Sequence, residues 1–145
     1  SNPRLLSDVA EKFGNQVLVV SLDLKRSKQA RSGYAVTSHG GRVETDLDAL
    51  EWIEKVIALG AGELLVNSID ADGTLSGFDI EMLSAVRQRA EVPVIASGGA
   101  GSAADFVSAA RCGADAILAA SIFHDNSVSI AEAKLELKLA GYETR

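Results

Sequence analysis

The sequence contains little that could cross-link a fold or divide it into segments. Of its 145 residues one is cysteine and two are proline. A single cysteine excludes an intrachain disulfide and a zinc site built from several cysteines, and we expect Cys112 to be a small core residue at a helix end. Because no Pro/Ser-rich linker or low-complexity tract interrupts the chain, the sequence predicts a single domain over residues 1–145.

The sequence also lacks long apolar runs and an excess of basic charge. No apolar run approaches the roughly 18 residues of a membrane-spanning helix, and the first residues do not show the basic-then-apolar pattern of a secretion signal. Fourteen basic residues against twenty acidic ones give a net charge of −6, the wrong sign for a general binder of nucleic acid or anionic membrane. We therefore expect a soluble protein of the reducing cytoplasm, which can still bind phosphate through backbone N–H groups.

Four short apolar runs dominate what is present. They cover residues 17–22, 64–69, 92–96 and 116–120. Near-continuous apolar strands are typical of a parallel sheet that is buried on both faces. Each run leads through a turn towards a segment of helical period, which predicts an α/β fold of four strand–helix units, (βα)₄.

Four of the five predicted helices end at glycines, and one insertion interrupts the alternation. Helical periodicity covers residues 47–57, 80–86, 106–110 and 130–139, and also 4–13 behind an Asn2 cap. Residues 25–46 alternate around a Gly-Gly pair, which predicts a small hairpin in a long loop. Four units are half of an eight-unit barrel of about 250 residues, while a flavodoxin-like open sheet needs about five strands. The count alone leaves both open.

Carboxylates stand at the carboxyl ends of the predicted strands, where function gathers in parallel α/β folds. Asp23 ends the first run. Burying a carboxylate there costs free energy unless the carboxylate is paired or remains solvated. Lys25, two residues later, points to the same face of a strand and could keep the Asp23 carboxylate ionised. A structural Asp–Lys pair at the rim is therefore an alternative to a catalytic Asp23. Asp70 and Asp72 follow the second run, and we expect one of them to cap the turn before Gly73.

Small residues follow the second, third and fourth runs. They are Gly73, Ser97, Gly98, Gly99, Gly101 and Ser121. Glycines there let a ligand approach the backbone and expose N–H groups at helix N-termini, where anions are stabilised. These turns predict a phosphate site. The phosphate site of eight-fold barrels commonly comes from the last two strand loops, so if the third and fourth runs are those two strands, the chain is the C-terminal half of a barrel. The alternative is that Gly-Gly merely makes a tight turn.

Three further polar residues have simpler interpretations. His39 and His124 lie in predicted turns without Cys or His partners at metal-ligand spacing, so we predict no metal site. Glu63 precedes its strand, at the end opposite to Asp23, and a charge there is ordinarily a solvated rim residue.

Five motifs occur along the chain. They are, in order, Val19-Val20-Ser21-Leu22-Asp23-Leu24-Lys25-Arg26, Asn67-Ser68-Ile69-Asp70-Ala71-Asp72-Gly73-Thr74, Gly77-Phe78-Asp79, Ile95-Ala96-Ser97-Gly98-Gly99-Ala100-Gly101 and Ala119-Ala120-Ser121-Ile122-Phe123-His124. Together they closely resemble the cyclase subunit of imidazole glycerol phosphate synthase, specifically strands five to eight of its (βα)₈ barrel. The resemblance runs over nearly the whole chain.

The resemblance implies a role for each matching residue. Asp23 matches one of two essential acid/base aspartates, and Asp72 matches a supporting active-site acid. Glu63 matches a charged ring at the barrel bottom, where ammonia is thought to enter. The phosphate site of the C-terminal half is matched by Gly73, Ser97, Gly98, Gly99, Ala120 and Ser121. Supporting positions are Lys25, Ser68 and Asp70.

The activity implied by the resemblance is ammonia-dependent cleavage and ring closure in histidine biosynthesis. The substrate would be a phosphoribulosyl-formimino aminoimidazole carboxamide ribonucleotide, the product imidazole glycerol phosphate, and no cofactor would be needed. Implied partners are a glutaminase subunit and an N-terminal half-barrel, or a second copy of the chain that closes a pseudo-barrel. Two alternatives stay open: a phosphate-binding half-barrel without catalysis, and a cyclase homologue of surface-sugar synthesis.

Overall fold

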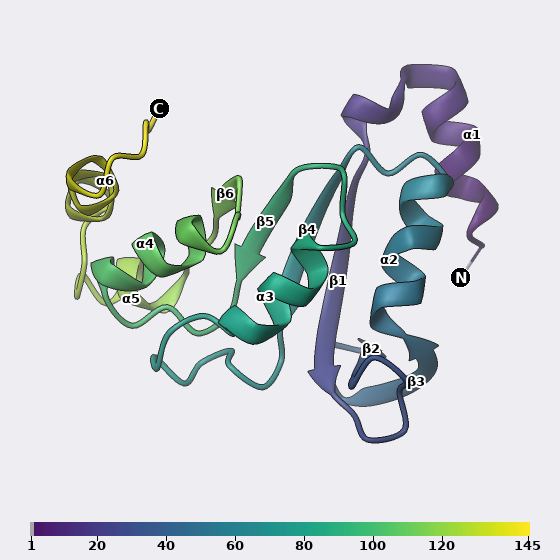
Figure 1. The fold of residues 1–145 in the computed structure, drawn as a ribbon, viewed down its shortest axis with the longest axis horizontal. Helices are drawn as coiled ribbons and strands as arrows, with labels where there is room; N and C mark the ends of the chain where they lie inside the picture. The colour runs from purple at the N-terminus through teal and green to yellow at the C-terminus, as the bar shows by residue number, and fades with distance from the viewer. Residues whose placement is uncertain (1) are drawn as a thin grey trace.

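A computed structural model describes residues 2–145 and shows one open sheet of six strands (Figure 1). The strand order across the sheet is β3-β2-β1-β4-β5-β6. The strands are β1 (Val19–Arg26), β2 (Tyr34–Ser38), β3 (Val43–Asp48), β4 (Glu63–Ser68), β5 (Val94–Ser97) and β6 (Ala116–Ile117). Strands β1, β4, β5 and β6 run parallel in that order. The α/β class is therefore confirmed, and the open sheet is compatible with half of a (βα)₈ barrel.

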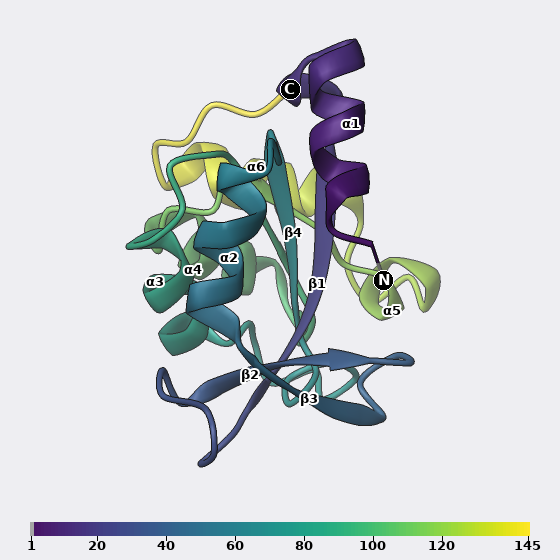
Figure 2. The ribbon, with the colours of Figure 1, turned by 90° about the vertical axis from the view of Figure 1, so that its right-hand side faces the viewer.

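The predicted hairpin exists, and it extends the sheet. Strands β2 and β3 pair antiparallel, and β2 also pairs antiparallel with the last residues of β1, with Leu24 opposite Val36 and Arg26 opposite Tyr34. The hairpin lies at the carboxyl end of the parallel strands (Figure 2). It therefore covers the edge of β1 at that end and leaves the edge unpaired from Val19 to Leu22.

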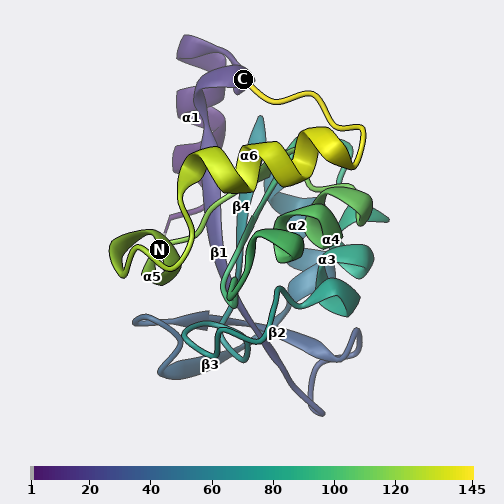
Figure 3. The same cartoon turned by 90° about the vertical axis from the view of Figure 1, so that its left-hand side faces the viewer.

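Seven helical segments precede, connect or follow the strands. They are α1 (Arg4–Phe13), the 3₁₀ turn η1 (Asn15–Val17), α2 (Ala49–Ala58), α3 (Ile80–Arg87), α4 (Ala103–Arg111), α5 (Ser121–His124) and α6 (Ile130–Leu139). Helices α2, α3 and α4 lie together on one side of the sheet (Figures 2 and 3). Their N-termini are capped by Asp48, Asp79 and Ser102, residue types whose side chains satisfy the free N–H groups of a first turn.

The core forms between these helices and alternate residues of the strands. Leu22, Leu24, Leu64 and Val66 point towards the helices and are buried. Their helical partners include Ile53, Val56, Met82 and Val86. Each such side chain contributes about 1.5–3 kcal/mol when fully buried. A second buried cluster, which includes Phe78, Phe106 and Ile122, packs around α4 and α5.

The other face of the parallel strands is not covered in the same way. Val19 on β1 is 47% exposed and Leu118 after β6 is 44% exposed, and Ser21 and Ala116 are also exposed. The prediction that the strands are buried on both faces is therefore wrong for residues 2–145. Four strands make one layer over the helices, and the second face needs a further layer that this stretch of chain does not supply.

Several local predictions shift by a few residues. Leu47, predicted to begin a helix, lies in β3, and the helix begins at Ala49 after the Asp48 cap. The cap of α1 is Pro3 rather than Asn2; the Asn2 side chain accepts a hydrogen bond from the Arg4 N–H at 3.2 Å. Cys112 ends α4 as predicted but is only partly buried. No helix between residues 2 and 145 is long and apolar enough to span a membrane.

Candidate functional site

Three side chains from neighbouring strands form one row across the uncovered face. Asp23 of β1 lies in register with Asn67 of β4, and Asn67 lies in register with Ser97 of β5. Residues in register on parallel strands face the same side of the sheet. All three are partly buried. Asn67 and Ser97 lie at the carboxyl ends of β4 and β5, whereas Asp23 lies within β1, which continues to Arg26 and does not end before Asp23 as predicted. The predicted acid and the predicted phosphate turn are therefore brought to the same edge.

Asp23 is held by neutral donors. The Asn67 side-chain amide donates to the Asp23 carboxylate at 3.2 Å, and the Thr37 hydroxyl of the hairpin donates to the Asp23 carbonyl at 3.0 Å. Among residues 2–145 no ion pair joins Asp23 to Lys25, so the predicted Asp–Lys pair is not formed. The other Asp23 carboxylate oxygen accepts no hydrogen bond from residues 2–145, so it can exchange a proton with a bound molecule.

The β4–α3 turn separates its two aspartates. The Asp70 carboxylate accepts a hydrogen bond from the Arg26 backbone N–H at 2.7 Å, so Asp70 fixes the turn, as expected for one of the pair. Asp72 and Gly73 lie exposed at the tip. The Asp72 N–H donates to the Ser68 carbonyl at 2.9 Å, while no recorded contact within residues 2–145 joins the Asp72 carboxylate to Asp23.

Ser68 does not face the same side as Asp23. It is 1% exposed and belongs to the helix-facing set of β4. Its hydroxyl accepts from the Ala71 N–H at 3.3 Å and donates to the Asp79 carboxylate at 3.4 Å. Ser68 therefore supports the turn from beneath and does not reach the uncovered face.

The β5–α4 turn carries free backbone donors. Gly98 and Gly99 are buried and have φ angles of 89° and 107°, which L residues rarely adopt. Within residues 2–145 the N–H groups of Gly98, Gly99 and Ala100 donate to no recorded acceptor. Successive N–H groups in such a turn form an anion-binding concavity, so the turn can accept a phosphate.

Glycine is required in this turn for a second reason, close packing against another loop, which the sequence did not indicate. A Cβ on Gly99 would overlap the Gly77 carbonyl oxygen, and a Cβ on Gly101 would overlap the Leu75 carbonyl oxygen. The β4–α3 loop thus lies directly on the β5–α4 turn, and the Gly77 N–H donates to the Gly99 carbonyl at 2.8 Å. By contrast, a Cβ on Gly73 would meet nothing within 4 Å, although its φ is 74°.

Ala120 and Ser121 complete the edge beside this turn. Ala96 of β5 is in register with Ile117 of β6, and the Leu118 N–H donates to the Ala96 carbonyl at 2.9 Å. Continuing that register places the chain after Ile117 next to the turn after Ser97. Ser121 begins α5, and the first N–H groups of a helix have no intrahelical acceptor. The two turns therefore leave the sheet side by side.

Glu63 lies at the opposite end of the same face. It begins β4 in register with Val19, four residues before Asn67. At about 3.3 Å of rise per residue this places it roughly 13 Å from the Asp23 row. Glu63 is partly buried. Its position agrees with a charged group at the amino end of the sheet.

Two site residues were not predicted from the sequence. The one sequence signal for Asn67 as a site residue is strand alternation, which places it on the same face as Glu63 and Leu65. Thr37 becomes a neighbour of Asp23 only through the hairpin. No group of three or more His, Cys, Asp or Glu side chains in the described part of the chain is arranged to hold a metal ion.

Comparison with known proteins shows the family of the chain. The family model described as histidine biosynthesis protein matches residues 1–129. The chain belongs to this family. The matched residues include the Asp23–Asn67–Ser97 row and all the turns described above.

Several curated relatives are named imidazole glycerol phosphate synthase subunit HisF. The chain is 59% identical over 145 residues to the protein of Leifsonia xyli subsp. xyli, covering all of this chain and 57% of the relative. It is 55% identical to that of Bifidobacterium adolescentis and 52% identical to that of Streptomyces coelicolor, covering 58% and 57% of those proteins. The chain thus spans little more than half the length of the relatives it matches.

Proposed function

We propose that this chain is the C-terminal half-barrel, strands five to eight, of an imidazole glycerol phosphate synthase cyclase. The observation that carries the proposal is the Asp23–Asn67–Ser97 row, which joins an acid to a turn of free N–H groups. The phosphate turns follow the last two parallel strands, β5 and β6, which is where eight-fold barrels commonly build this site.

Phosphate binding in this proposal rests on backbone and hydroxyl donors. The residues concerned are Gly73, Ser97, Gly98, Gly99, Ala120 and Ser121. Unpaired N–H groups and helix N-termini stabilise an anion without any positively charged side chain, which reconciles phosphate binding with a net charge of −6. The ligand would be one phosphate of the phosphoribulosyl-formimino aminoimidazole carboxamide ribonucleotide.

Asp23 would supply acid–base chemistry beside that phosphate. Adding ammonia to an imine and closing the imidazole ring require proton transfers, and a carboxylate within about 3 Å of the reacting atom can perform them. Asn67 positions the carboxylate at 3.2 Å. Asp72, exposed at the tip of its loop, would approach the substrate as a second acid, with Lys25 as a charged neighbour.

The uncovered face defines the partners in the proposal. Exposed Val19 and Leu118 would be covered by an N-terminal half-barrel, or by a second copy of the chain that pairs the free part of β1 with β6. Ammonia from a glutaminase subunit would enter past Glu63 at the amino end. A cytoplasmic location belongs to the same proposal, since a doubly phosphorylated metabolite does not pass through lipid.

The test combines the chain with an N-terminal half-barrel from a relative, together with substrate and an ammonium salt. We expect imidazole glycerol phosphate to form, and Asp23→Asn to lower the rate by more than about a hundredfold. Asp8→Asn, on the exposed surface of α1, is the matched control and should keep the rate. Phosphate binding without activity in any pairing would instead support a binding module.

A further inference from the structure

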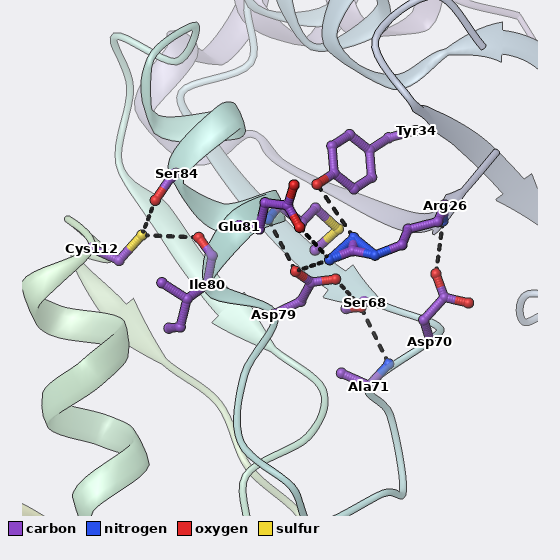
Figure 4. Close-up of polar contacts among 11 residues, drawn as sticks. Arg26, Tyr34, Ser68, Asp70, Ala71, Asp79, Ile80, Glu81, Ser84 and Cys112 are labelled. Carbon is purple, nitrogen blue, oxygen red and sulfur yellow. Dashed lines mark hydrogen bonds and ion pairs between the residues drawn. The ribbon is translucent and has the colours of Figure 1, made fainter. Parts of the chain in front are cut away.

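Arg26, the last residue of β1, contacts both ends of the β4–α3 loop (Figure 4). Its backbone N–H donates to the Asp70 carboxylate at 2.7 Å, at the start of the loop. Its guanidinium donates to the Asp79 carboxylate at 3.0 Å, at the end of the loop. Weaker partners surround the guanidinium: the Glu81 carboxylate at 3.0 Å and the Tyr34 hydroxyl at 3.3 Å.

Asp79 is the partner that matters energetically. Its side chain is 9% exposed, whereas that of Glu81 is 81% exposed. Ion pairs in full solvent contribute little, while charge-assisted hydrogen bonds to a sheltered carboxylate are stronger. Asp79 also accepts from the Met82 N–H at 3.0 Å, so the guanidinium is tied to the first turn of α3.

The loop between these two attachments lies on the phosphate turn. Its backbone occupies the space that Cβ atoms on Gly99 and Gly101 would need, and it carries Gly73 at its tip. The spacing between Gly73 and the Gly98–Gly99 turn therefore depends on where residues 70 and 79 are held. Arg26 is attached at both of these positions.

We propose that Arg26 is a positioning residue for phosphate binding. It acts through Asp79 and Asp70, and it sets the distance between the β4–α3 loop and the β5–α4 turn without touching the ligand. This inference rests on the proposed function for its phosphate, but the loop attachment itself can be measured separately.

Amide hydrogen exchange measures the attachment. The Gly77 N–H donates across to the Gly99 carbonyl, and the Leu64 N–H donates to the Pro93 carbonyl within the sheet. In Arg26→Gln we expect exchange at Gly77 to accelerate by about tenfold, with exchange at Leu64 unchanged. Arg26→Lys, which keeps the charge but not the planar fork, should recover part of the protection.

Phosphate titration measures the consequence. Inorganic phosphate is added to the labelled chain, and the amide shifts of Gly98 and Gly99 give its affinity. Arg26→Gln should weaken binding by about tenfold. The control is Arg89→Gln, which removes an equally charged residue that follows α3 and forms its ion pair with Glu54 of α2; its phosphate affinity should match that of the wild type.

The outcomes separate the two proposals. If Gly77 exchange in Arg26→Gln equals that of the wild type, the positioning role is wrong. If Gly77 accelerates while phosphate affinity is unchanged, Arg26 is structural only and the inference is again wrong. If phosphate moves neither glycine amide in the wild-type chain, the proposed function fails. Should Arg26→Gln not fold, Asp79→Asn keeps the cap but loses the ion pair and must reproduce the Gly77 result.

Discussion

The Asn67 side chain contacts Asp23 on one side and lies against Gly98 on the other. Its amide nitrogen donates to the Asp23 carboxylate at 3.2 Å, and its oxygen lies 2.8 Å from where a Cβ on Gly98 would be. One neutral side chain thus links the proposed acid to the proposed phosphate turn. Movement of the turn at Gly98 would therefore be transmitted through Asn67 to the Asp23 carboxylate.

The first prediction concerns this link. In the chain assembled with an N-terminal half-barrel, Asn67→Ala should lower kcat by about tenfold, because it removes one hydrogen bond that orients Asp23. The measurement is the ammonia-dependent rate at saturating substrate. Ser21→Ala, one row below on the same face, is the control. Equal rates for wild type and Asn67→Ala would show that Asn67 does not orient the acid.

The second prediction separates two kinds of glycine. Gly99→Ala should lower the free energy of unfolding by about 2–4 kcal/mol, because the new Cβ overlaps the Gly77 carbonyl and the φ of 107° is unfavourable for alanine. Gly73→Ala should cost only about 1–2 kcal/mol, since its φ is 74° but the space is open. Urea denaturation of both variants measures the difference. Equal losses would contradict the close packing of the two loops.

The third prediction is a pH dependence centred on Asp48. Burial tends to raise the pKa of this carboxyl, but hydrogen bonds from Ser32, Glu51 and Leu50 more than offset burial and leave the pKa below its ordinary 3.8. The charged form therefore favours the folded state: the stabilisation is complete above pH 3.8 and is lost as the pH falls below it. In Asp48→Asn, urea midpoints measured between pH 6 and pH 2.5 should decline less steeply. An identical decline would assign the acid sensitivity to other groups.

The fourth prediction concerns the uncovered face. Alone, the chain should self-associate, because a sheet with a free edge and an exposed apolar face binds other copies. Val19→Lys should shift sedimentation towards the monomer. Leu75→Lys, at a site of similar exposure in the β4–α3 loop, is the control and should leave association unchanged. A monomeric wild-type chain at about 0.1 mM would contradict the prediction.

Local patterns in the sequence were sufficient to predict the strand–helix alternation and the hairpin of residues 25–46. Apolar runs and helical periodicity depend on near neighbours, so they survive in any tertiary context. The carboxyl-end positions of Asp23 and Ser97 followed from the parallel order of the strands. The sequence also located the glycine turns, but it did not indicate that loop packing requires glycine there.

Contacts between distant segments were decided only by the tertiary structure. Asn67 meets Asp23 across 44 residues, Arg26 meets Asp79 across 53, and Gly99 lacks a side chain because the carbonyl of Gly77 lies over it. The sequence by itself determined which segments become strands and helices and which end of the sheet carries the acid and the glycines. The tertiary structure decided which side chains touch and which sheet face stays open, because packing and hydrogen-bond geometry depend on groups that chain order does not bring together.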